Sequence, residues 1–150
     1  MEKEFCRVRT IKDIAISLAI IVAGFILIAL PTSVSLNVTG FLLICTGLLF
    51  ALVLRSGYKD LLSGELYCKS EKYFDRSLKT DLSVAIQSEP SQINLTEENK
   101  GNGVRLDIYY SAKNGKAYTQ LFEYIPYEYQ PCTEVHEHEL CKVKKILGKL

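Results

Sequence analysis

The stretch from Ile14 to Leu54 contains no charged residue, and one short polar break, Pro31-Thr32-Ser33, divides it in two. The two apolar runs lie at about residues 14–30 and 34–54. A helix of roughly 20 apolar residues, and of about 17 at least, crosses a bilayer core. Lipid offers no partner to an unpaired backbone amide, so both runs must be helical. The sequence therefore predicts two membrane-spanning helices joined by a tight turn.

Basic residues flank both apolar runs and are absent from the turn between them. The first run follows Lys3, Arg7, Arg9 and Lys12, and the second run precedes Arg55 and Lys59. The positive-inside rule then places both termini in the cytoplasm, with a bacterial inner membrane as the expected location. A cleavable signal peptide is the alternative for the first run, although its apolar stretch exceeds the roughly 7–15 residues typical of such a segment.

Beyond the apolar runs the composition becomes that of a globular domain. We divide the chain into a membrane segment, residues 1–55, and a cytoplasmic α+β domain, residues 56–150, which holds all nine tyrosines. The formal net charge of the chain is +1, and the absence of a lysine-rich block argues against nucleic-acid binding. The five cysteines are odd in number and irregularly spaced, which favours a reducing compartment.

Local patterns predict the elements of this domain. Arg55 to Leu62 is expected to continue the second helix out of the membrane. A strand is expected from Glu65 to Lys69, with Phe74 as the alternative end. A helix is expected over Ser77 to Ser88, where Leu78, Leu82, Ala85 and Ile86 recur at helical spacing.

The second half of the domain carries the clearest signal. Alternation predicts strands from Val104 to Ser111 and from Ala117 to Ile125, and Asn114-Gly115 between them is a strong hairpin signal. Pro126 and Pro131 are expected to end the sheet, and a final helix is expected from Thr133 to Leu147. The resulting fold class is a transmembrane helical hairpin followed by a small domain in the order strand, helix, hairpin, helix, with an antiparallel sheet and both helices on one face.

The segment from Cys132 to Cys141 is the sharpest candidate for chemistry. Its Cys132, His136, His138 and Cys141 have the ligand types of a zinc site. On a single helix at about 100° per residue, His138 and Cys141 would lie across the axis from the other two, so four ligands could not close around one ion. The same residues would suit a cysteine nucleophile with a histidine base, but no third group is evident. We expect no cofactor.

Tyrosines concentrate in the hairpin and the segment after it. Alternation turns some of their rings away from the core, and exposed rings supply large, rigid contact area at low entropic cost. Cross-strand packing is the alternative role for the same rings. The predicted partner-binding residues are Tyr109, Tyr118, Tyr124, Tyr127 and Tyr129.

Small residues recur within the apolar runs. Ala15, Ala19 and Ala23 are spaced four apart, and Gly40 and Gly47 lie on nearly one face of the second run. Such residues let helices approach closely, so they are expected to pack the two spans on each other or to mediate dimers.

Three classes of function follow from these features. The first is a non-enzymatic anchor, in which the bilayer-bound hairpin holds a domain that binds a protein or small-ligand partner. The second is a metal-dependent or cysteine-based enzyme or sensor built on the segment from Cys132 to Cys141. The third is a homo-oligomeric membrane element, although no ionisable residue lies between Ile14 and Leu54 to line an ion pathway. The first reading accounts for the most features.

Overall fold

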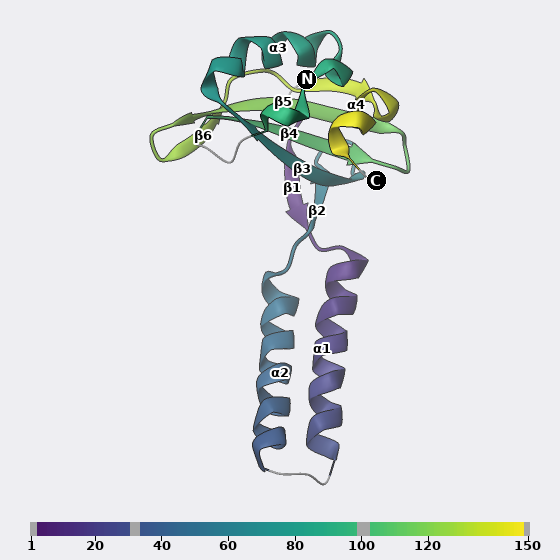
Figure 1. The fold of residues 1–150 in the computed structure, drawn as a ribbon. Coiled ribbons are helices and arrows are strands. Elements are labelled where there is room, and N and C mark those ends of the chain that lie inside the picture. Colours follow the sequence, from purple (N-terminus) through teal and green to yellow (C-terminus); the bar gives the residue numbers. More distant parts are fainter. Residues whose placement is uncertain (1–2, 31–33, 99–102, 149–150) are drawn as a thin grey trace. The chain divides into compact units, whose positions relative to one another are not determined.

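The computed structural model describes residues 3–30, 34–98 and 103–148. The chain divides into two compact units (Figure 1). One runs from Arg7 to Gly57, and the other joins Met1–Cys6 to Tyr58–Leu150. We call the first the helical hairpin and the second the sheet domain. The predicted turn at Pro31-Thr32-Ser33 lies outside the described residues.

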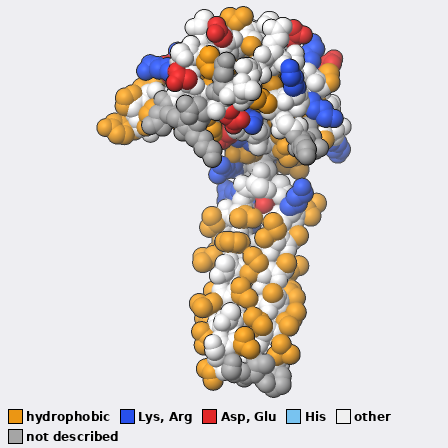
Figure 2. Space-filling model, in the orientation of Figure 1, with side chains coloured by type: hydrophobic (Ala, Val, Ile, Leu, Met, Phe, Trp, Pro, Cys, Tyr) orange, Lys and Arg blue, Asp and Glu red, His pale blue; other side chains and the backbone are white. Residues whose placement is uncertain are grey.

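The helical hairpin consists of α1 (Ile11–Ala29) and α2 (Val34–Val53). Thr10 caps α1 through a reciprocal pair of hydrogen bonds with Asp13, a capping box. Both helices are long and apolar enough to cross a membrane. Their side chains are mostly exposed, and Figure 2 shows apolar groups covering the surface of both helices. Two long apolar helices packed as a hairpin are therefore present, as the sequence predicts.

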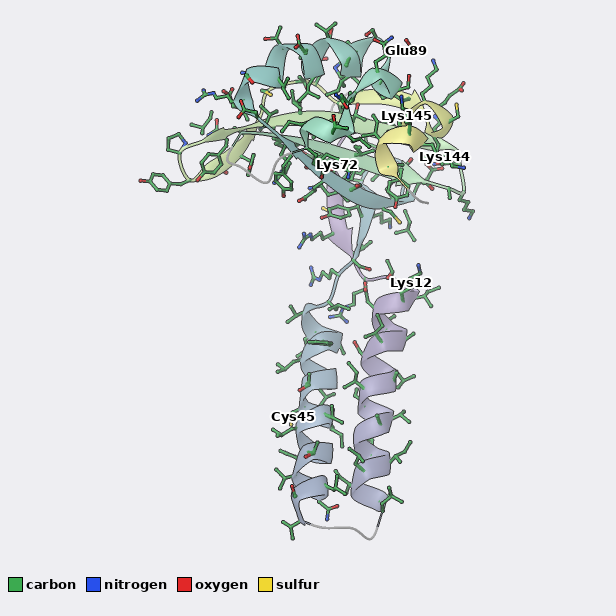
Figure 3. All side chains as sticks on the ribbon, viewed as in Figure 1. Lys12, Cys45, Lys72, Glu89, Lys144 and Lys145 are labelled. Carbon is green, nitrogen blue, oxygen red and sulfur yellow. The ribbon has the colours of Figure 1, made fainter. Side chains whose placement is uncertain are left out.

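Glycines set the distance between α1 and α2. A Cβ built on Gly40 would lie 2.7 Å from the carbonyl oxygen of Gly24, and one on Gly47 would lie 2.5 Å from a side-chain carbon of Ile21. The backbones thus touch at Gly40, and Gly47 packs against the Ile21 side chain. A larger residue at either position would push the helices apart or displace Ile21. Ala15, Ala19 and Ala23 instead lie on the exposed side of α1. Cys45 is half-buried on α2 (Figure 3).

The sheet domain is built on seven strands in the order β1-β2-β3-β4-β5-β6, with β7 also paired to β5. The strands are β1 (Phe5–Val8), β2 (Gly57–Asp60), β3 (Leu66–Phe74), β4 (Val104–Ser111), β5 (Lys116–Ile125), β6 (Glu128–Pro131) and β7 (His136–Glu139). Every pairing from β2 onward is antiparallel. The predicted β4–β5 hairpin is confirmed, and Gly115 in its turn has a φ of +67° that favours glycine.

Two helices cover one face of the sheet: α3 (Lys79–Gln87) and α4 (Leu140–Leu147) (Figure 1). Short 3-10 turns at Arg76–Leu78, Pro90–Gln92 and Leu95–Glu97 complete the described elements. Lys144 and Lys145 lie in the last turn of α4, where a helix dipole favours cations (Figure 3). The main core lies beneath both helices and contains Phe74, Leu82, Ile86, Ile93, Val104, Leu106, Ile108, Ala117, Leu121, Val143 and Ile146.

Two predicted helical segments are wrong. The helix expected over Thr133–Leu147 begins only at Leu140, because the preceding residues run beside β5: β6 pairs with one end of it and β7 with the other. The backbone hydrogen bonds of β5 outweigh the local helical pattern here. The helix expected over Arg55–Leu62 is also wrong, because α2 ends at Val53 and β2 follows. The predicted order of four elements therefore lacks β1, β2, β6 and β7.

Candidate functional site

The two faces of the sheet differ in what covers them. On β4, Leu106 and Ile108 point into the core under α3 and α4. The intervening residues Arg105, Asp107 and Tyr109 point to the opposite face, because side chains alternate along a strand. This opposite face has three zones along the sheet: an aromatic cluster, a group of four charges, and a patch where tyrosines surround an arginine.

The aromatic cluster occupies one end of this face. Tyr67, Tyr109 and Tyr118 are at most 9% exposed, and Phe5 and Tyr58 pack against them. The ring of Phe5 stacks on that of Tyr109 with centroids 4.1 Å apart. The predicted partner-binding residues Tyr109 and Tyr118 are therefore covered by the N-terminal strand.

Lys3 closes the edge of this cluster. Its Nζ lies 2.9 Å from the Tyr118 hydroxyl, 3.0 Å from a carboxylate oxygen of Asp60 and 4.0 Å from the Tyr118 ring centroid. Asp60 is fully buried and also accepts a hydrogen bond from the Ser63 hydroxyl. Burial alone would raise the pKa of Asp60, but the hydrogen bonds from Ser63 and Lys3 outweigh it and lower that pKa. Lys3 is thus tied to the sheet by a part-buried ion pair with Asp60.

Four charged side chains form the central zone. Lys69 Nζ lies 2.7 Å from Asp107 and 2.6 Å from Glu71, and the Arg105 Nε lies 2.8 Å from Asp107. Asp107 is 1% exposed, so burial raises its pKa, and Lys69 and Arg105 offset only part of that shift. Burial alone would lower the pKa of Lys69, but its contacts with Asp107 and Glu71 raise it. Two cations and two anions make this zone electrically neutral.

The third zone surrounds the guanidinium of Arg105 with aromatic rings. The guanidinium carbon lies 4.8 Å from the ring centroid of Phe122 and 4.7 Å from that of Tyr129. Tyr129 also meets Tyr124 and Tyr73 edge-on, at centroid distances of 5.2 and 6.1 Å. All five side chains are half-buried, so each retains surface open to solvent. We name Tyr73, Arg105, Phe122, Tyr124, Tyr129 and the adjoining Tyr127 the tyrosine–arginine face.

Tyr127 occupies the tip of the β5–β6 hairpin. The register pairs Ile125 with Glu128, so Pro126 and Tyr127 alone make the turn. Proline in the second position and a positive φ in the third are features of a type II turn, whose third position favours glycine. Tyr127 has a φ of +79° there, and its side chain is 97% exposed. Strained backbone of this kind is concentrated at functional sites.

The sequence found only part of this face. The structure brings together three of the predicted residues, Tyr124, Tyr127 and Tyr129. The other three members, Tyr73, Arg105 and Phe122, were not predicted from the sequence. Alternation on β4 already turns Arg105 away from the core, but its aromatic neighbours come from β5 and β6. Only the strand register brings these residues together.

The segment from Cys132 to Cys141 is spread over several environments. Cys132 is half-buried and donates from Sγ to the Leu121 carbonyl oxygen, and burial raises its pKa. Cys141 is exposed, with its Sγ 3.3 Å from a carboxylate oxygen of Glu139. Across residues 3–30, 34–98 and 103–148, no group of three or more His, Cys, Asp or Glu side chains is arranged to hold a metal ion.

The two histidines lie on β7 rather than on a helix, so the single-helix geometry expected for them is wrong. A ring nitrogen of His138 lies 3.0 Å from the hydroxyl oxygen of Thr119. Burial lowers the pKa of His138, and electrostatic repulsion from the neighbouring His136 and Lys142 lowers it further. The half-buried His138 ring is therefore favoured in its neutral form.

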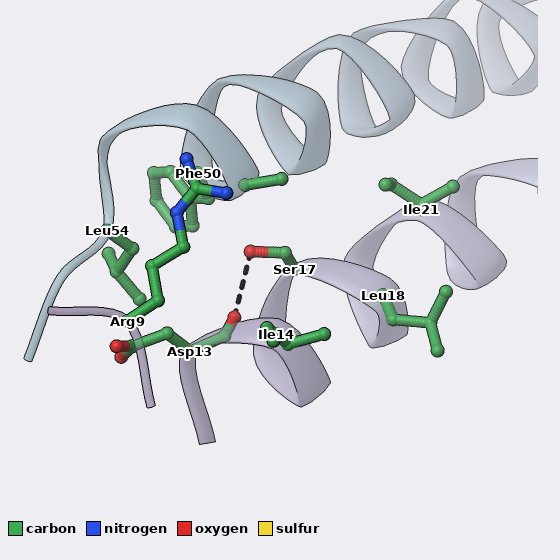
Figure 4. A pocket seen from close by; sticks show the side chains of 9 residues that line it. Arg9, Asp13, Ile14, Ser17, Leu18, Ile21, Phe50 and Leu54 are labelled. Carbon is green, nitrogen blue, oxygen red and sulfur yellow. Dashed lines mark hydrogen bonds between the residues drawn. The ribbon is translucent and has the colours of Figure 1, made fainter. Parts of the chain in front are cut away.

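A groove in the helical hairpin is a separate candidate. It has a volume of about 310 Å³ and lies between the start of α1 and the end of α2 (Figure 4). Its walls are mostly apolar, and its polar lining residues are Arg9, Asp13 and Ser17. The Ser17 hydroxyl donates to the backbone oxygen of Asp13, and Arg9 Nη2 donates to the backbone oxygen of Leu52.

Comparison of the chain with protein-family models, with curated proteins and with solved structures finds no match. The function must therefore be argued from the residues themselves.

Proposed function

We propose that the chain is an integral membrane protein whose helical hairpin anchors the sheet domain on the cytoplasmic side, where the tyrosine–arginine face binds a partner protein without catalysis. The anchor rests on two long helices whose apolar side chains are mostly exposed. Covering so much apolar surface with lipid removes it from water, which is strongly favourable. The basic residues that flank both helices favour the cytoplasmic placement of the domain.

The single observation that supports the binding role is the composition of the tyrosine–arginine face. Tyrosine and arginine are the residues, with tryptophan, that most often dominate the free energy of protein–protein contacts. Arg105 is held between Phe122 and Tyr129, so little side-chain freedom remains to be lost when a partner covers it. Tyr127 at the hairpin tip adds a fully exposed ring whose backbone conformation is costly for the fold alone.

Anchoring makes a modest contact surface sufficient. Two residues separate β1 from α1, and three separate α2 from β2, so both connections between the sheet domain and the apolar helices are short. Confinement near the bilayer raises the effective concentration of the domain for any partner in the same membrane. A partner protein resident in that membrane is therefore the expected occupant of this face.

Site-specific photo-crosslinking in native membranes tests the binding role. A photoreactive phenylalanine analogue at position 127 should give a discrete adduct, which mass spectrometry would identify. The matched control is position 84 on α3, because Val84 is 61% exposed on the opposite face of the sheet. Tyr129→Ala should weaken the adduct formed from position 127. Equal adducts from positions 127 and 84, or none from 127, would contradict the proposal.

Two further measurements test the anchor and its orientation. The full chain should stay in the membrane pellet after alkaline carbonate extraction, and its appearance in the supernatant would refute membrane insertion. Protease added to intact cells should leave residues 56–150 undigested. Digestion of that region would place the sheet domain outside the cell.

A further inference from the structure

The groove of the helical hairpin combines an apolar trough with a cationic rim. Ile14, Leu18, Ile21 and Phe50 supply the apolar walls, and Arg9 lies at the mouth beside the end of α2 (Figure 4). Because α1 begins at Ile11 and α2 ends at Val53, the mouth coincides with the ends of the two apolar helices. In a bilayer this is the depth at which hydrocarbon gives way to phosphate headgroups.

The charges of the helical hairpin as a whole are strongly unbalanced. The helical hairpin contains four cations, Arg7, Arg9, Lys12 and Arg55, and one anion, Asp13. The carboxylate of Asp13 already accepts hydrogen bonds from the backbone N–H groups of Thr10 and Ser56, at 2.8 and 2.9 Å. Among the described residues, no carboxylate lies within 4 Å of the Arg9 guanidinium. The mouth therefore favours an anion.

Arg9 retains donors for such an anion. A guanidinium carries five N–H groups, and the contact with the Leu52 carbonyl oxygen, at 3.0 Å, uses one of them. Arginine binds phosphate through paired, charge-assisted hydrogen bonds. Basic pockets between transmembrane helices on the cytoplasmic side recurrently hold anionic lipid headgroups.

We infer that this groove binds an anionic phospholipid of the surrounding bilayer, with one acyl chain in the apolar trough and the phosphate on Arg9. The inference rests on the proposed membrane anchor, since the ligand is supplied by the bilayer. Arg9 thereby binds the phosphate of one lipid directly, whereas the other basic residues attract anionic lipids only through their net charge.

The test is native mass spectrometry of the full chain in detergent, titrated with phosphatidylglycerol or with phosphatidylcholine of the same chains. Phosphatidylglycerol should be retained preferentially. Arg9→Gln should weaken its retention by about tenfold or more, because a hydrogen bond to a charged group is lost. The matched control is Lys12→Gln, a neighbouring exposed cation outside the groove, which should weaken retention by about fivefold at most.

A second variant addresses the trough. Ala51 lines the groove, so Ala51→Phe should block the acyl chain and lower retention of phosphatidylglycerol. Ala23→Phe, on the exposed side of α1, should leave retention unchanged. Circular dichroism shows whether each variant keeps its helices. Equal losses of phosphatidylglycerol in Arg9→Gln and Lys12→Gln, or full retention of it in Ala51→Phe, would overturn the inference. Failure of the proposed anchor would show separately, as extraction of the unmodified chain by alkaline carbonate.

Discussion

Replacing Tyr127 with glycine should stabilise the sheet domain while it removes a ring from the proposed binding face. Tyr127 lies in the third position of the Pro126-Tyr127 turn with a φ of +79°. Its side chain is 97% exposed, so the ring contributes almost no buried area to the fold. The backbone strain of this position therefore has no compensating contact within the domain.

The expected gain can be estimated from two opposing effects. A left-handed conformation costs a non-glycine residue about 1 to 2 kcal/mol. Glycine loses more backbone freedom on folding, which costs roughly 0.5 to 1 kcal/mol. The middle values of the two ranges give a net stabilisation of about 0.75 kcal/mol. In a domain of this size, where about 1 kcal/mol shifts the unfolding temperature by about 4 to 8 °C, the variant should unfold about 3 to 6 °C higher.

Thermal unfolding of the full chain in detergent would measure this shift. The chain has nine tyrosines and no tryptophan, so near-ultraviolet circular dichroism reports on the packed tyrosine rings. Tyr127→Ser is the control, because it removes the ring but keeps the backbone strain, and its stability should change by about 0.5 kcal/mol or less. A Tyr127→Gly variant that unfolds at the same temperature as the unmodified protein, or below it, would refute the strain argument.

Three other predictions follow from buried groups. Gly40→Leu should weaken the pairing of the two helices, because its Cβ would lie 2.7 Å from a backbone oxygen of α1. Ala23→Leu, on the exposed side of α1, should be tolerated. Thermal loss of the helical circular dichroism signal would compare the two variants. Ile86→Ala should destabilise the sheet domain by about 2 to 5 kcal/mol, and Val84→Ala, exposed on the same helix, by about 0.5 kcal/mol or less, as measured by chemical denaturation. Burial lowers the pKa of His138 from its ordinary value of 6.5, so protonation of His138 favours the unfolded chain. The free energy of unfolding should therefore fall as the pH drops below about 6.5. His138→Phe should flatten this pH dependence, and an equal slope of unfolding free energy against pH in both proteins would contradict the prediction.

Local signals explain what was predictable from the sequence. The strands Val104–Ser111 and Lys116–Ile125 follow from alternation and an Asn-Gly turn only four residues long. The helix Lys79–Gln87 follows from apolar residues three and four apart. In each case the determining residues are neighbours in the chain, so no distant partner is needed to recognise the element.

Distant pairing explains what was not predictable. His136 to Glu139 form a strand because the edge of β5 offers unpaired backbone groups to them. The partner residues lie elsewhere in the sequence, so these four residues alone do not reveal the strand. Val135, which lies within the helix expected from Thr133 to Leu147, packs against the aromatic cluster, on the face of the sheet opposite Val143 and Ile146. Short strands of this kind depend on their partners more than on their own composition.

Charge and hydropathy alone determined that the first third of the chain forms two long apolar helices, because a run of about forty residues without a charge has few ways to avoid water. Only the tertiary structure decided which tyrosines are covered and which remain open. Tyr109 and Tyr124 point to the same face of the sheet, but Phe5 stacks on the first, and Tyr129 and solvent surround the second. Strand alternation sets the face of a side chain, whereas its exposure depends on segments that the chain brings back from more than a hundred residues away.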